Sequence, residues 1–308
     1  MHSSYLAFLP AGLLEYPDVR PESTFWRWRD RDIHLERVHR PEASVRMLLI
    51  HGGGGHAAAL WPFAALAAER GFEVVTPDLP GYGATRVPAP SKITYPDWVD
   101  CVTDLVRAEH AADDRPLIVV GASMGGMLAY EAAARTGLVA AVVATCLLDM
   151  RLPQARAAVG RHPRLANYAA RLLLPAFDRL RVPMRWLADM NAISNDPALT
   201  KLIVADTLGG GVAMPLGFLR TYLHSAPAIE PEDFTACPVW LTHPGADHWT
   251  PLAVSRSFFD RIAAPKTLLV LPDSGHYPIE TPGLEQLARA FDEVRAYVDG
   301  APFTGREP

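Results

Sequence analysis

The chain is poor in cysteine, in basic clusters and in long apolar runs. Its 308 residues include three cysteines, too few for a disulfide framework. Cys146 and Cys237 lie in or beside predicted strands, where free thiols commonly pack. A reduced, cytoplasmic setting is therefore the simplest prediction.

No apolar stretch reaches the roughly 20 residues that span a bilayer. The apolar N-terminal segment, residues 5–14, is interrupted by Pro10 and Gly12 and follows no basic segment, so it is a poor secretory signal. The net charge of −5 gives no electrostatic attraction for nucleic acid. These features predict no nucleic-acid partner and no stable membrane insertion.

Metal-binding patterns are missing as well. His51, His56, His243 and His248 each follow a predicted strand. Their spacings fit no common zinc motif, and no cysteine or paired carboxylate accompanies them. We expect neither a metal site nor a cofactor.

The chain does contain a regular alternation of strand and helix patterns. Hydrophobic residues make up 49% and charged residues 20%, which is typical of a globular protein with a sizeable core. A hairpin at residues 24–29 and 33–38 precedes the alternation. The pattern predicts an α/β fold, a mostly parallel sheet covered by helices on both faces. The predicted strands are residues 47–50, 73–76, 117–120, 141–148, 238–242 and 266–271, and the predicted helices are residues 58–69, 96–108 and 124–135.

The alternation is interrupted once. Residues 150–230 show no strand pattern, only short helical segments separated by prolines. We predict a core made of residues 1–149 and 231–300, with a helical cap inserted at residues 150–230. Residues 301–308 are predicted to form a loose tail.

The most informative segment is Gly-Ala-Ser-Met-Gly at residues 121–125, between a predicted strand and a predicted helix. In that context a G-x-S-x-G segment forms a sharp turn that presents the serine hydroxyl at the edge of the sheet. Ser123 is therefore the candidate nucleophile. The helix that follows would present unpaired N–H groups to a developing oxyanion.

A serine needs a base and an acid to become a good nucleophile. His276 follows the last predicted strand, and Asp247 follows the strand before it. The carboxyl ends of parallel strands open onto one edge of a sheet, so these side chains can converge on Ser123. The chain order Ser, Asp, His is the order found in α/β-hydrolases.

Several motifs together resemble the α/β-hydrolase superfamily over nearly the whole chain. They are the His-Gly-Gly segment at residues 51–53, Asp-Leu-Pro-Gly-Tyr-Gly at residues 78–83, the turn around Ser123, and the turns at residues 245–247 and 275–276. The segments 193–197 and 247–251 are similar to stretches in monoacylglycerol lipases and lysophospholipase-like esterases. The resemblance implies a Ser123–Asp247–His276 catalytic triad.

The resemblance also implies an oxyanion hole formed by the backbone N–H groups of Gly53 and Met124. The glycine run at residues 52–55 departs from the usual pattern of that branch. It is similar to the triple-glycine loop of another esterase branch, or it simply permits a tight turn.

Other acidic residues compete for the role of the acid. Asp149 also ends a predicted strand, but Asp247 lies in the better-matched turn. Asp78 is interpreted as structural, and Asp273 as a solvated turn carboxylate.

The cap is expected to form the pocket for a hydrophobic part of the substrate. Apolar residues recur at helical spacing along two of its segments, although such stripes can also just hold a cap together. His56 and Trp249 are further candidates for substrate contact. The two stripes are Leu165, Tyr168 and Leu172, and Leu216, Leu219 and Leu223.

These features predict a serine hydrolase, lipase-like or esterase-like, acting on a small-molecule ester with a hydrophobic portion. The same residues could serve a thioesterase, an amidase or a carbon–carbon bond hydrolase. A non-catalytic ligand-binding protein is the alternative outside enzymes, because a fold does not fix a function.

Overall fold

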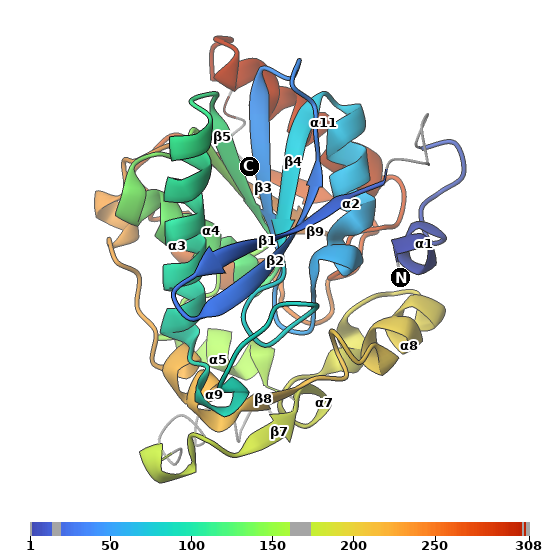
Figure 1. Cartoon of the computed structure of the whole chain (residues 1–308). Coiled ribbons are helices and arrows are strands. Elements are labelled where there is room, and N and C mark those ends of the chain that lie inside the picture. Colours follow the sequence, from blue (N-terminus) through green and yellow to red (C-terminus); the bar gives the residue numbers. More distant parts are fainter. Residues whose placement is uncertain (1, 14–19, 161–173, 304, 306–308) are drawn as a thin grey trace.

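An eight-stranded sheet forms the centre of the structure, a computed structural model that describes residues 2–13, 20–160, 174–303 and 305 (Figure 1). The two N-terminal strands are antiparallel to their neighbours, and the other strands pair in parallel. The predicted mostly parallel sheet is thus confirmed. In sheet order the strands are β1 (Glu22–Trp28), β2 (Arg31–Val38), β4 (Phe72–Pro77), β3 (Val45–Ile50), β5 (Leu117–Gly121), β6 (Ala141–Ala144), β9 (Val239–Pro244) and β10 (Lys266–Leu271).

Helices cover both faces of this sheet, as the alternation predicts. One face packs against α3 (Tyr95–Ala112), α4 (Met124–Thr136) and α10 (Leu252–Phe259). The other packs against α2 (Ala57–Glu69) and α11 (Gly283–Val298), and the short α1 (His2–Leu6) contacts α2. Strands β3 to β6 are buried along their whole length, which explains their nearly continuous apolar sequences.

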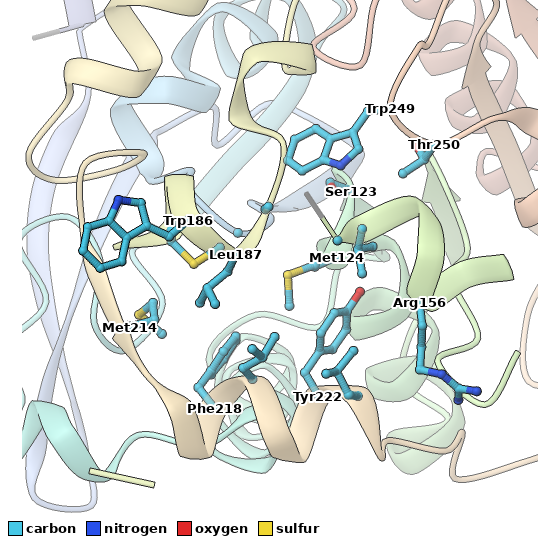
Figure 2. A pocket seen from close by; sticks show the side chains of 17 residues that line it. Ser123, Met124, Arg156, Trp186, Leu187, Met214, Phe218, Tyr222, Trp249 and Thr250 are labelled. Atoms are coloured by element: carbon cyan, nitrogen blue, oxygen red, sulfur yellow. The ribbon is translucent and has the colours of Figure 1, made fainter. Parts of the chain in front are cut away.

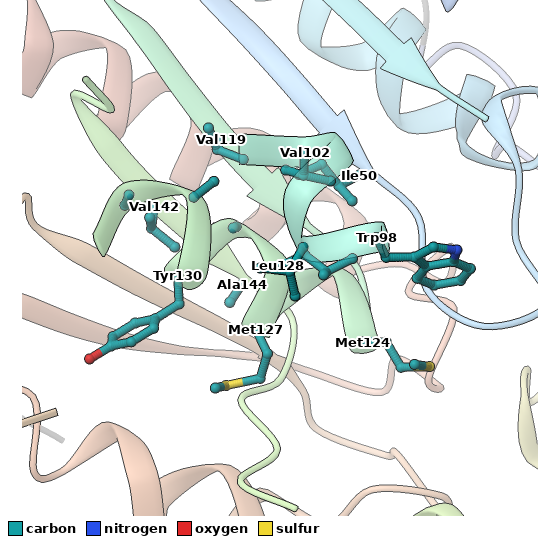
Figure 3. Close-up of a cluster of buried hydrophobic side chains, with 14 of the residues drawn as sticks. Ile50, Trp98, Val102, Val119, Met124, Met127, Leu128, Tyr130, Val142 and Ala144 are labelled. Atoms are coloured by element: carbon teal, nitrogen blue, oxygen red, sulfur yellow. The ribbon is translucent and has the colours of Figure 1, made fainter. Parts of the chain in front are cut away.

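Helix α4, which begins right after Ser123, is fixed by its apolar surroundings (Figure 3). Leu128 is fully buried in a cluster with Val102 of α3, Val119 of β5 and Val142 of β6. Because such a core is close-packed, it holds the helix and the residue before it in one position.

Strand β6 is shorter than the sequence predicts. It ends at Ala144, where its pairing with β5 also ends at Gly121. Residues 145–148, a threonine followed by three apolar residues, are buried without extending the strand. The prediction of a strand over residues 141–148 was therefore wrong at its end, because an apolar pattern marks burial and not hydrogen-bonded pairing.

Between β6 and β9 the chain leaves the sheet. Figure 1 shows the elements of residues 150–230 on the side of the sheet where the parallel strands end. The expectation that this segment contains no strand was wrong, because β7 and β8 pair as a small antiparallel sheet. The segment contains α5 (Pro153–Val159), η2 (Pro175–Phe177), β7 (Arg181–Pro183), α7 (Met184–Leu187), η3 (Met190–Ala192), α8 (Pro197–Ala205), β8 (Ala213–Pro215) and α9 (Leu216–Leu223).

Two short 3₁₀ turns, η1 (Pro90–Lys92) and η4 (Pro231–Asp233), complete the described elements. None of the helices in the described ranges is both long and apolar enough to cross a membrane.

Candidate active site

Ser123 occupies a strained turn between β5 and α4. Its backbone has φ 55° and ψ −124°, a region that non-glycine residues rarely adopt. The turn is tight because β5, α4 and β3 approach closely here. A Cβ at Gly121 would collide with the carbonyl oxygen of Gly125, and a Cβ at Gly125 would lie 2.5 Å from the carbonyl oxygen of Ile50. Glycine at both positions thus lets the serine stand at the sheet edge.

The His276 side chain lies against this serine. It follows β10, and its Nε2 is 2.9 Å from the Ser123 Oγ. On the other side of the ring, Nδ1 is 2.8 Å from Oδ2 of Asp247. The side chains of His276 and Asp247 are only 3% and 1% exposed, so water screens this chain of contacts poorly.

The Asp247 carboxylate is held by more than the histidine. It accepts hydrogen bonds from the backbone N–H groups of Trp249 and Thr250 and from the Thr250 hydroxyl. Burial opposes its charge, but the hydrogen bonds from His276 and Thr250 outweigh burial and lower the pKa of Asp247 to about 2. Asp247 is consequently ionised at neutral pH and stabilises a positive charge on His276.

The other carboxylates lie in different environments. Asp149 pairs with Arg151, and it makes no described contact with His276. Asp78 accepts hydrogen bonds from the backbone N–H groups of Ala57 and Ala84, which is consistent with a structural role. Asp273 is exposed in a turn after β10.

The two loops that carry Asp247 and His276 both touch the inserted segment. The backbone N–H of Tyr277 donates to the carbonyl of Ile193 at 2.8 Å, and the Asn195 side chain donates to the carbonyl of Ala246 at 3.2 Å. Residues 193–195 therefore bridge the loops that carry Asp247 and His276.

A glycine loop, residues 52–55, lies beside Ser123. A Cβ at Gly52 would be 2.7 Å from the Cβ of Ser123, and one at Gly53 would be 3.0 Å from the Met124 sulfur. His51 anchors the start of the loop. Its Nε2 accepts from the backbone N–H of Leu79, which leaves Nδ1–H to donate to the Gly52 carbonyl. Burial lowers the pKa of His51 to about 4, so this ring is neutral at pH 7.

Gly53 and Met124, which the resemblance predicts to form an oxyanion hole, lie next to each other. Both residues line the same cavity as Ser123. Within the described part of the chain, neither N–H donates a hydrogen bond. Two such N–H groups next to a serine hydroxyl can donate hydrogen bonds to a negatively charged oxygen.

A cavity of about 250 Å³ opens beside Ser123 (Figure 2). Its walls are largely apolar and come from α7, α9 and β8 of the inserted segment and from α4 of the core. The lining includes Met124, Met184, Leu187, Met214, Phe218 and Leu223. Three methionines give the wall side chains that adapt to ligands of irregular shape.

A second, smaller cavity of about 60 Å³ also reaches Ser123 and His276. It is lined by the glycine loop and by Leu60, Phe63 and Tyr277. The serine hydroxyl thus lies between a large space and a small one.

The structure separates the substrate-contact predictions into three groups. Leu219, Leu223 and Trp249 line the larger cavity. Leu216 and His56 are not among the described residues that line this cavity. The Nε2 of His56 instead lies 2.8 Å from Oδ2 of Asp206. Leu165, Tyr168 and Leu172 fall outside the described residues.

Sequence reasoning missed three residues of the site. Thr250 contacts the acid, and Phe218 and Tyr222 line the larger cavity. The two aromatic residues stand at i and i+4 on α9, beside the leucines of the predicted stripe. An aromatic pair at that spacing was the available signal. Among the described residues, no cluster of three or more His, Cys, Asp or Glu side chains is arranged to hold a metal ion.

The parallel sheet, the strained serine turn and a histidine reaching it from the last strand define a hydrolase of the α/β class. The chain belongs to the alpha/beta hydrolase family, whose model matches residues 47–290. The family resemblance read from the sequence motifs is thereby confirmed.

Curated relatives match only part of the chain. Protein phosphatase methylesterase 1 of Homo sapiens is 29% identical over 116 residues, and that of Mus musculus is 30% identical over the same length. These matches span 37% of this chain and 30% of each relative.

Solved structures match nearly the whole chain. A soluble variant of the monoglyceride lipase of Saccharomyces cerevisiae has a TM-score of 0.69 at 18% identity, covering 92% of this chain and 97% of that one. A carboxyl esterase of Bacillus coagulans has a TM-score of 0.68 at 14% identity, covering 91% and 98%. At such identities the likeness shows the shared fold.

Proposed function

We propose that the protein is a serine hydrolase that cleaves carboxylic esters with a hydrophobic acyl portion through an acyl-enzyme intermediate. The observation that carries this proposal is the chain of contacts from Ser123 Oγ through His276 to Asp247, placed at the mouth of an apolar cavity.

In the first half of the reaction, Ser123 Oγ attacks the carbonyl carbon of the ester. His276 takes the serine proton on Nε2 and then gives it to the oxygen of the leaving alcohol. Asp247 holds Nδ1 and stabilises the imidazolium in between. In the second half, His276 takes a proton from water, the hydroxide attacks the acyl group, and the proton returns to Ser123.

The negative charge on the carbonyl oxygen would be received by the N–H groups of Gly53 and Met124. Met124 also stands at the N-terminus of α4, where the helix dipole favours a negative charge. Because the donors are fixed by the backbone before substrate arrives, they need no reorganisation in the transition state. This arrangement is the oxyanion hole of the proposal.

The larger cavity would hold the acyl group, and residues 150–230 would act as a cap that sets its length. A buried methylene contributes about 0.8 kcal/mol, so two additional methylenes change affinity by roughly tenfold while the cavity accommodates them. The names of the methylesterase and lipase relatives support ester cleavage, and a monoacylglycerol lipase-like branch fits the apolar wall.

The test is single-turnover and steady-state hydrolysis of 4-nitrophenyl esters of graded acyl length. We expect a burst of 4-nitrophenol equal to the enzyme concentration, which Ser123→Ala abolishes. Labelling by a fluorophosphonate should show the same dependence. A binding protein would give neither a burst nor labelling, and an equal burst from Ser123→Ala would refute the nucleophile.

A further inference from the structure

The cavity beside Ser123 contains two hydrogen-bonding groups that have no partner. The hydroxyl of Tyr222 and the indole N–H of Trp249 are both buried and form no hydrogen bond in the structure. Both residues line the larger cavity. In the described part of the chain, few buried side-chain nitrogen or oxygen atoms lack a hydrogen-bond partner. Two such atoms around one cavity therefore need an explanation.

The two groups flank the candidate nucleophile. Tyr222 comes from α9 and is 4% exposed. Trp249 follows Asp247, and its ring packs on the His276 ring at 4.7 Å between centroids. Figure 2 shows Trp249 and Tyr222 on opposite sides of Ser123 and Met124, with the phenol oxygen turned toward them.

Leaving such groups unpaired is unfavourable, because they lost their hydrogen bonds to water when they were buried. The neighbouring wall offers mainly methionine, leucine and phenylalanine side chains. The missing partner therefore belongs to a molecule that enters the cavity. It must accept hydrogen bonds, because an indole N–H can only donate.

The partner is also an uncharged group. Burial raises the pKa of Tyr222 well above its ordinary value, so the phenol stays neutral and acts as a donor. Arg156 is the one cationic side chain among the described lining residues, and its guanidinium donates to the carbonyl oxygens of Met150 and Arg151. A neutral keto, ether or hydroxyl oxygen fits this environment better than a carboxylate.

We propose that the acyl group of the substrate carries a neutral oxygen in its chain, which accepts a hydrogen bond from Tyr222 Oη, while Trp249 Nε1, on the opposite side of Ser123, donates to a different oxygen of the substrate. This inference rests on the proposed ester hydrolysis and deepens it. A plain hydrocarbon chain would fill the apolar cavity but leave the Tyr222 hydroxyl unpaired. An oxygen at the right position along the chain pairs with this hydroxyl, so Tyr222 selects oxygenated acyl groups over hydrocarbon ones.

The test compares 4-nitrophenyl hexanoate with isosteric esters in which an ether oxygen replaces each methylene of the chain in turn. Each kcat/KM is divided by the rate of alkaline hydrolysis of the same ester, which removes differences in intrinsic reactivity. We expect one oxygen position to be preferred over hexanoate. In Tyr222→Phe the ratio of kcat/KM for that ester to kcat/KM for hexanoate should fall about tenfold.

Two further variants keep the test sharp. Trp249→Phe removes the donor on the opposite side of Ser123, so it should leave the preferred oxygen position unchanged, and because it loosens the packing on His276 it should reduce kcat for hexanoate. Tyr130→Phe removes a phenol that donates to the Ile229 carbonyl away from the cavity, so it should leave every ratio unchanged.

The outcomes separate this inference from the proposed function. If the wild type hydrolyses the esters through Ser123 but Tyr222→Phe changes all of them equally or not at all, the oxygenated substrate is refuted and the esterase remains. If no ester is hydrolysed through Ser123, both are refuted.

Discussion

Thr250 donates two hydrogen bonds to the Asp247 carboxylate, from its backbone nitrogen to Oδ1 at 2.9 Å and from its hydroxyl to Oδ2 at 2.7 Å. The second bond goes to the same oxygen that faces His276. The threonine thus fixes the direction of the carboxylate, and the histidine ring follows that direction.

Replacing this threonine tests its positioning role. Thr250→Val keeps the shape and the backbone donor but removes the hydroxyl. We expect kcat to fall about tenfold or less, with KM nearly constant, because one charge-assisted hydrogen bond is lost. Thr103→Val is the matched control, since the Thr103 hydroxyl donates to the Val99 carbonyl within α3, away from the site. An unchanged kcat would show that the Thr250 hydroxyl does not position Asp247 for the reaction.

Neutralising the acid should have a much larger effect. Asp247→Asn preserves shape but removes the charge that supports the imidazolium, and we expect kcat to fall by about 10⁴, as in a serine protease with the equivalent change. Asp149→Asn should leave kcat nearly unchanged, because Asp149 pairs with Arg151. Steady-state kinetics of both variants decide the matter. A larger loss in Asp149→Asn than in Asp247→Asn would identify Asp149 as the acid.

The glycine loop gives a steric test. In Gly52→Ala the new methyl group would meet the Ser123 Cβ at 2.7 Å, so the loop must shift away from the serine and kcat/KM should fall by about 10² or more. Gly137→Ala provides the contrast. Its φ of +65° strains alanine, but no atom lies nearby.

For that control we expect a loss of about 1 kcal/mol of unfolding free energy and full activity. Thermal unfolding and kinetics should be measured on both variants. Equal activity of Gly52→Ala and the wild type would show that the loop does not help to shape the site.

The backbone strain at Ser123 should lower the free energy of unfolding by a measurable amount. Glycine tolerates the φ of 55° and alanine does not, so Ser123→Gly should unfold at a higher temperature than Ser123→Ala, by the equivalent of about 1 kcal/mol. At Ser257, inside α10, the order should reverse, since glycine is the poorer helix former. The same order at both positions would mean that the turn stores no strain.

A buried link between Tyr5, His56 and Asp206 predicts a dependence of stability on pH. Burial opposes the charge of Asp206, but hydrogen bonds from His56 and Tyr5 outweigh it and lower its pKa from 3.8 to about 2. A lowered pKa stabilises the fold above pH 4, by roughly 2 kcal/mol here, and this contribution is lost as the pH falls toward 2.

Asp206→Asn should therefore be less stable than the wild type at pH 7, and the difference should shrink as the pH falls from 4 to 2. Chemical denaturation across this range measures it. Tyr5→Phe, which keeps the carboxylate, should show a smaller difference at pH 7. If the difference in unfolding free energy between the wild type and Asp206→Asn does not change with pH, the charge of Asp206 is not its cause.

The sequence predicts the sheet and its covering helices well because buried parallel strands and amphipathic helices leave strong patterns. It also predicts that Ser123, Asp247 and His276 share one edge, since each follows a parallel strand. It misses β7 and β8, because each has only three residues and ends in proline. Three residues cannot show a reliable alternation.

Contacts between segments that are distant in the sequence could not be predicted either. His56 and Asp206 lie 150 positions apart, and no local pattern joins them, so the sequence left His56 as either a substrate contact or a support of its own loop. Tyr222 was passed over because the leucine stripe on α9 suggested a single apolar face. In the structure this helix also turns its aromatic residues toward the cavity, which only the packing of the inserted segment reveals.

The bridge formed by residues 193–195 limits how this protein can be re-engineered. Under the proposed function, a foreign insertion grafted at positions 150 and 230 is expected to change the substrate range, and it would remove the hydrogen bonds that join Ile193 and Asn195 to the loops of His276 and Asp247. A chimera with those junctions keeps the sheet and its helices but loses part of the support for Asp247 and His276. Donor segments should therefore retain residues 193–195 or join the chain on either side of them.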